Sequence, residues 1–197
     1  MVRATLAAFA VLLAAHLPAT ANEYSTPSDP RWAAMVFGGN LLDNKWDQVF
    51  LEPQNLKFEN AYLIGLAVHR RIARPFSFLD VEVEVNATRH FGDQRHWEVN
   101  GPLLTGRITR FPWSHWLDTS AAFGLGPSYA NRVPRLEGIN EGSSERLLMY
   151  WFIEVDAALP AENWRAVWRL HHRSTGYGTF GDDGGSNALT IGIRRQF

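Results

Sequence analysis

The sequence predicts an all-β protein, an eight-stranded antiparallel up-and-down transmembrane barrel. Eight segments alternate between apolar and polar residues with a period of two, which is the spacing of side chains on the two faces of a strand. Short turns and longer loops rich in Gly, Asp and Asn alternate between these segments. The chain also contains eight tryptophans and no cysteine. Together these features are typical of barrels that cross a bacterial outer membrane.

The strands are expected in order at residues 32–41, 59–72, 78–90, 96–111, 117–129, 146–158, 164–174 and 186–197. Their apolar faces include Tyr62, Ile64, Leu66 and Val68 in the second, Leu79, Val81, Val83, Val85 and Ala87 in the third, Phe123 and Leu125 in the fifth, Met149, Trp151 and Ile153 in the sixth, Trp164, Trp168 and Leu170 in the seventh, and Leu189, Ile191 and Ile193 in the eighth. The alternation is blurred in the fourth strand at Gly101-Pro102. Short connections follow the second, fourth and sixth strands, which places those turns on the periplasmic side.

The first residues resemble a secretory signal. Arg3 gives a basic start, residues 4–17 form an apolar run, and residues 19–21 match a small-x-small cleavage site. We therefore expect a signal peptide over residues 1–21 and a single outer-membrane barrel domain over residues 22–197. The alternative is a retained N-terminal anchor, although the apolar run is short and alanine-rich for a spanning helix.

Charge and composition limit the partners and the interior. The formal net charge is -1 at pH 7, which argues against a nucleic-acid partner. The cations are almost all arginine, which suits ion pairs in a polar lumen. The acidic residues expected to meet Arg165, Arg169 and Arg173 across that lumen are Asp80, Glu82, Glu84, Glu154 and Asp156. Because eight strands leave an interior filled by side chains, we expect no pore.

A soluble antiparallel sandwich or a lipocalin-like periplasmic carrier would show the same alternation with apolar residues inside. The export signal, the alternating loop lengths, the aromatic residues near strand ends and the terminal Phe197 favour the membrane barrel.

The candidate chemistry lies on residues 164–174. One face of this strand carries Trp168, Leu170, His172 and Ser174, so a base and a nucleophile point the same way at the rim of an apolar surface. Counting back by twos from the C-terminus puts Asn187 on the same face of the last strand. We predict Ser174 as nucleophile, His172 as general base and Asn187 as the group that orients the imidazole.

These three residues are expected to face lipid near the outer leaflet, where lipopolysaccharide lies. Backbone N–H groups around Thr175, Gly176 or Gly178 are candidates for an oxyanion hole. The lipid-facing surface of the sixth to eighth strands, including Trp151, Trp168 and Leu170, would form the groove for an acyl chain.

No cofactor and no metal ligand is assigned. His171 and His172 are adjacent, but neighbours on a strand point to opposite faces and do not share one ion easily. His171 is therefore expected to face the lumen beside the arginines. The Gly-rich run at residues 181–185 is no phosphate-binding loop, because no helix is expected to follow it.

The C-terminal third resembles the lipid A 3-O-deacylase family, outer-membrane barrels that carry His-x-Ser on the penultimate strand, a loop containing Gly and Asp, and an acidic triad member at the start of the last strand. The matching positions are His172 to Ser174, residues 181–185 and Asn187. The resemblance implies an outer-membrane serine esterase that removes the ester-linked 3-hydroxyacyl chain from lipid A of lipopolysaccharide, without a cofactor.

The chain departs from the family pattern in two places. The family's Ser-Asn-Ala-Gly reads Ser-Thr-Gly-Tyr at residues 174–177. The family's glutamate aligns with Ser186 when counted from Ser174 and with Asn187 when counted from the C-terminus. Strand parity favours Asn187, and Asp182 or Asp183 could supply a carboxylate from the loop.

The alternative function is a non-catalytic small outer-membrane barrel that acts in adhesion or membrane integrity. It would work through its extracellular loops, at residues 41–55 and 131–145. Lipid A, or whole lipopolysaccharide, and the outer membrane are the expected partners of the enzyme, and a homodimer is left open.

Overall fold

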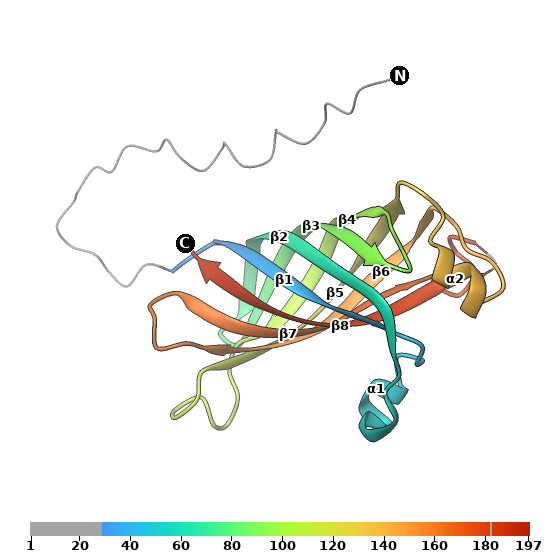
Figure 1. The fold of residues 1–197 in the computed structure, drawn as a ribbon. Coiled ribbons are helices and arrows are strands. Elements are labelled where there is room, and N and C mark those ends of the chain that lie inside the picture. The colour runs from blue at the N-terminus through green and yellow to red at the C-terminus, as the bar shows by residue number, and fades with distance from the viewer. Residues whose placement is uncertain (1–28, 182) are drawn as a thin grey trace, which may run out of the picture.

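Eight antiparallel strands close into one barrel in the computed structural model of this chain (Figure 1), which describes residues 29–181 and 183–197. Each strand pairs with its neighbour in sequence and the first pairs with the last, so the predicted up-and-down topology is confirmed. The strands are β1 (Trp32–Leu42), β2 (Phe58–Phe76), β3 (Leu79–Gly92), β4 (Trp97–Ile108), β5 (Thr119–Ala130), β6 (Leu147–Ala158), β7 (Trp164–Ser174) and β8 (Gly185–Gln196). The predicted signal peptide, residues 1–21, lies outside the described residues.

β2 is longer than predicted. The strand was expected to end at Ile72, and proline at position 75 has no N–H for the ladder. Instead, the register with β3 shifts twice between Arg71 and Phe76, and these irregularities keep the strand paired up to Phe76 opposite Leu79. The turn that follows is therefore only two residues long.

Three short helices in the outer loops were not predicted. They are α1 (Gln48–Leu51) and η2 (Pro53–Asn55) between β1 and β2, and α2 (Arg135–Asn140) between β5 and β6. Helices of three to six residues are too short to show a clear apolar period in the sequence. Among the described residues, no helix is long and apolar enough to cross a membrane.

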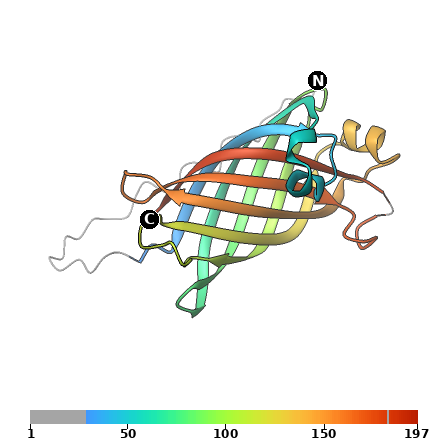
Figure 2. The ribbon, with the colours of Figure 1, turned by 90° about the horizontal axis from the view of Figure 1, so that it is seen from below.

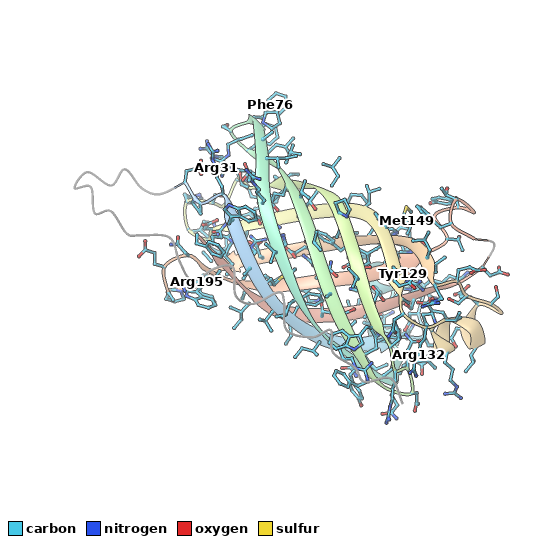
Figure 3. All side chains as sticks on the ribbon, turned by 90° about the horizontal axis from the view of Figure 1, so that it is seen from above. Arg31, Phe76, Tyr129, Arg132, Met149 and Arg195 are labelled. Carbon is cyan, nitrogen blue, oxygen red and sulfur yellow. The ribbon has the colours of Figure 1, made fainter. Side chains whose placement is uncertain are left out.

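The outer wall of the barrel is apolar, whereas the lumen holds a network of buried charged residues together with apolar residues such as Phe37 and Phe152; side chains fill the lumen and line the outer wall (Figure 3). The buried charged residues of the strands include Glu84, Glu98, Arg107, Glu154, Asp156, Arg169, Arg173 and Arg194. The exposed apolar residues of the strands include Ile64, Leu66, Val68, Val85, Leu104, Phe123, Val155, Ile191 and Ile193. This polarity is the reverse of a soluble sandwich or a lipocalin-like barrel, which bury their apolar faces.

Glu154 lies at the centre of the ion-pair network in the lumen. Its carboxylate accepts hydrogen bonds from Arg107 at 2.8 Å, from Arg194 at 2.8 Å and from Arg169 at 2.6 Å. Arg169 also binds both carboxylate oxygens of Glu84, at 2.7 and 2.8 Å. The predicted pairing of lumen-facing arginines with strand carboxylates is correct for Arg169, and also for Arg165, which binds Asp156 at 2.5 Å.

The prediction for Arg173 is wrong. Its guanidinium binds Glu137 of α2 rather than a strand carboxylate. Glu137 is buried and also accepts hydrogen bonds from Ser144 at 2.6 Å and Ser186 at 2.8 Å. Burial raises the pKa of the Glu137 carboxyl, while the charge of Arg173 opposes that shift. α2 therefore closes the outer end of the lumen with a carboxylate from a loop, which strand parity alone does not reveal.

Candidate active site

β7 separates its two faces as predicted. His171 points into the lumen, where its Nε2 lies 3.0 Å from Glu98. His172 points to the outer face and stands directly opposite Asn187 in the register between β7 and β8. This pairing makes His172 and Asn187 cross-strand neighbours, as expected.

A hydrogen bond of 2.6 Å joins His172 Nδ1 to Asn187 Oδ1. The orientation of the Asn187 amide is fixed by a second contact, because its Nδ2 donates to the backbone carbonyl of Asn44 at 2.8 Å. A carbonyl only accepts, so the NH₂ group must face Asn44 and the oxygen must face His172. Nδ1 of His172 is then the protonated nitrogen, and Nε2 keeps the lone pair that a general base needs.

Ser174 lies two residues further along the same face, about 6.6 Å from His172 between backbone positions. The N–H of Gly176 donates to Ser174 Oγ at 3.4 Å. In the part of the chain that the structure describes, Ser174 and His172 are not joined by a hydrogen bond. The structure therefore brings His172 and Asn187 into contact, and it places Ser174 beside them with its hydroxyl turned toward the following turn.

The expectation that His172 and Asn187 face lipid directly is wrong. Each side chain is 8% exposed, because residues 43–57 fold over the outer surface of β6, β7 and β8. Figure 2 shows α1 lying across the outer ends of these strands. The His172 ring packs against the Trp151 ring, with 4.1 Å between centroids.

The predicted acyl-chain groove is likewise covered. Trp46 packs edge-on against Trp151, with 5.6 Å between ring centroids, and Phe50 packs against Trp168 at 6.2 Å. Leu170 is fully buried in a cluster that also contains Val49. The apolar run Val49 to Leu51, in an otherwise polar loop, was the sequence signal for this contact.

The outer side of this loop is itself apolar. Trp46, Phe50 and Leu51 are 44%, 45% and 76% exposed, so they continue the apolar outer surface of the barrel over the site. A cavity of about 220 Å³ opens beside Asn187, between residues 41–45, α2 and the start of β8.

The other residues considered from the sequence are placed apart from His172. Ser186 points into the lumen and binds Glu137, as strand parity predicts. Asp183 accepts a hydrogen bond from Ser143 at 3.4 Å, and Asp182 lies outside the described residues. Gly176 and Gly178 lie in a turn with φ angles of 62° and 82°, and the N–H of Gly178 donates to Thr175 at 3.5 Å. Of the candidate oxyanion donors, the N–H of Gly176 is therefore the one directed at Ser174.

Comparison with solved structures gives similar barrels at low identity. Neisserial surface protein A (NspA) matches over 84% of this chain and 97% of its own, with 10% sequence identity and a TM-score of 0.50. The outer membrane enzyme PagL matches over 84% of this chain and 99% of its own, with 9% identity and a TM-score of 0.51. No protein-family model and no curated protein matches the sequence. These likenesses support the eight-stranded barrel fold.

Proposed function

We propose that this chain is an outer-membrane serine esterase that removes an ester-linked acyl chain from lipid A. The observation that carries the proposal is the hydrogen bond between His172 Nδ1 and Asn187, which leaves Nε2 free to take a proton. Ser174 on the same face supplies the nucleophile. The sequence resemblance to the lipid A 3-O-deacylases supplies the substrate, the 3-hydroxyacyl ester.

The reaction follows from these positions. Ser174 Oγ attacks the acyl carbonyl while its proton passes to His172 Nε2. The tetrahedral oxyanion meets the N–H of Gly176, and its collapse releases the sugar alcohol, which takes the proton from His172. Water then attacks the acyl-enzyme by the same route and releases the fatty acid. Asn187 orients the imidazole but brings no charge, so the imidazolium is stabilised less than it would be by a carboxylate.

Location in the outer membrane is part of this proposal. It is supported by the apolar outer wall, by the polar lumen and by the likeness to NspA and PagL. With the short turns on the periplasmic side, the loops that carry α1 and α2 lie on the outer side of the membrane. Trp46, Phe50 and Leu51 then lie at the level of the lipopolysaccharide headgroups.

Lipid A treated with the purified chain is expected to lose one hydroxyacyl chain, as measured by mass spectrometry. Ser174→Ala is expected to leave the lipid A intact because the nucleophile is gone. The matched control is Ser143→Ala, which removes an exposed serine from an outer loop and keeps full activity. Equal deacylation by Ser174→Ala and wild type would refute the assignment of Ser174.

If the outer wall faces lipid, a charged residue on the wall should lower the free energy of unfolding more than one in an outer loop. Ile191 lies in the middle of β8 and is 72% exposed on the outer wall. Ile191→Arg is expected to lower the free energy of unfolding in a lipid bilayer by about 2–4 kcal/mol. Ile139→Arg, in α2 outside the barrel wall, should change it by less than about 0.5 kcal/mol. Urea unfolding in vesicles measures both, and equal values would contradict the proposed location.

One observation favours the second candidate, a non-catalytic barrel that acts through its loops. The loop at residues 43–57 covers His172, and Ser174 Oγ interacts with the turn rather than with the imidazole. This candidate predicts that the wild type leaves lipid A intact in the same mass-spectrometric experiment.

A further inference from the structure

Four buried side chains converge at the outer end of the lumen. They are His90 on β3, His96 just before β4, Glu98 on β4 and His171 on β7. His171 Nε2 lies 3.0 Å from Glu98 Oε1, and His90 Nε2 lies 3.3 Å from Glu98 Oε2. We propose that His90, Glu98 and His171 bind a divalent transition-metal ion of the zinc class, with His96 as a fourth ligand.

Several polar atoms of this cluster have no hydrogen-bond partner among the described residues. Among residues 29–181 and 183–197, Glu98 Oε2 has no hydrogen-bond partner and neither ring nitrogen of His96 has one, although both side chains are buried. Burying a polar atom without a partner costs free energy, and more for a charged group. A cation bound between Glu98 Oε2 and the imidazole nitrogens would satisfy these atoms together.

The spacing of the donor atoms is compatible with a bound zinc ion. One donor atom from each of His90, Glu98 and His171 can be chosen so that all three lie within 4.8 Å of one another. Zinc bonds of about 2.0–2.2 Å in a tetrahedron place the ligand atoms about 3.3–3.6 Å apart. His171 Nε2 lies 3.0 Å from Oε1 of Glu98 and His90 Nε2 lies 3.3 Å from Oε2, so an ion shared by all three residues would be bound by both carboxylate oxygens. His96 Nε2 lies 3.7 Å from Glu98 Oε2 but is not among the donor atoms that lie within 4.8 Å of one another, so His96 would take the fourth position by rotating its side chain.

The positive charges nearest the cluster are already paired with carboxylates, so they do not oppose a bound cation. The nearest guanidiniums on the same face of β7 are those of Arg169 and Arg173, which would repel a cation if they were unpaired. Arg169 binds Glu84 and Glu154, and Arg173 binds Glu137, so both charges are balanced. Asn100 donates to Glu98 Oε1 at 2.7 Å and holds the carboxylate in place, which is the usual work of residues around a metal ligand.

The donor set also indicates the class of ion. Imidazole nitrogens suit zinc, nickel and copper, whereas magnesium and calcium prefer sets made of oxygen alone. The site lies on the lumen side of β7, and His172 on the opposite face takes no part in it. A bound ion would join the β3–β4 hairpin to β7 across the lumen, beneath α2, and would act as a structural link.

The sequence analysis did not predict this site because it did not compare the lumen-facing residues of different strands. His171 was compared only with its neighbour His172, which points outward. The useful signal was that His90, His96, Glu98 and His171 all occupy lumen-facing positions near the outer ends of their strands.

The test is metal titration of the full-length, untagged chain, folded in detergent and stripped with a chelator. We expect calorimetry to show one Zn²⁺ ion bound per chain, no binding of Mg²⁺, and an absorption spectrum with Co²⁺ typical of tetrahedral nitrogen and oxygen ligands. Zn²⁺ is also expected to raise the temperature at which the barrel unfolds.

Glu98→Gln and His171→Gln should each weaken Zn²⁺ binding by about 100-fold or more, since both remove a ligand. The matched control is His69→Gln, which removes another buried lumen histidine that contacts Glu84 instead, at 3.2 Å. A heat-dependent shift in gel mobility verifies that each variant is folded. If one ligand variant does not fold, His90→Gln is measured in its place. The proposal is overturned if the wild type binds no Zn²⁺, or if the ligand variants bind it as tightly as the wild type.

Discussion

The substitution His172→Gln is expected to slow acyl hydrolysis by about 10²–10⁴-fold, the usual contribution of a general base. An amide side chain cannot take the proton of Ser174 or return it to the leaving alcohol. The hydrogen bond to Asn187 can still form, so the fold of the site should persist. The rate is measured as fatty acid released from lipopolysaccharide by the purified variant.

The control for this substitution is His115→Gln, in the exposed turn between β4 and β5, where the ring lies 3.2 Å from the carbonyl oxygen of Pro112. Its rate should equal that of the wild type. A His172→Gln rate within about twofold of the wild type would mean that the proton goes elsewhere, and the role given to His172 would be wrong.

The largest effect on stability is expected for Glu154→Ala. Removing this carboxylate leaves Arg107, Arg169 and Arg194 short of a buried counter-charge. Breaking a buried ion pair from one side costs about 3–5 kcal/mol, because the remaining charge is buried without compensation. Urea unfolding in lipid vesicles should show this loss.

Glu162→Ala is the matched control, since Glu162 is exposed in the turn between β6 and β7. It should change the free energy of unfolding by less than about 0.5 kcal/mol. A loss below about 1 kcal/mol for Glu154→Ala would show that the other carboxylates of the lumen, Glu82, Glu84 and Asp156, replace it.

The alternation of side chains along the strands predicted the two faces of β7, and together with the alternating loop lengths and the aromatic residues near strand ends it predicted the barrel. Parity is a local property, so it needs no knowledge of the rest of the chain. It placed His171 in the lumen and His172 outside, and counting from the C-terminus put Asn187 on the face where it meets His172. The register of an up-and-down barrel made this cross-strand contact predictable.

The loops could not be predicted in the same way. The cover of residues 43–57 over Leu170 and His172 depends on how the chain folds back onto the barrel wall, and this contact joins segments more than a hundred residues apart. The pairing of Arg173 with Glu137 has the same origin, because Glu137 comes from a short helix with no period to detect.

Hydrolysis by this chain would require His172 to activate Ser174 as a nucleophile on the outer face of β7. The most direct test is to treat the folded chain with a fluorophosphonate ester, which serine nucleophiles attack with loss of fluoride, and to weigh the intact protein. We expect a single adduct, located on Ser174 by peptide mapping and absent in His172→Gln. A wild-type chain that stays unlabelled, or that carries the label on another serine, would contradict it.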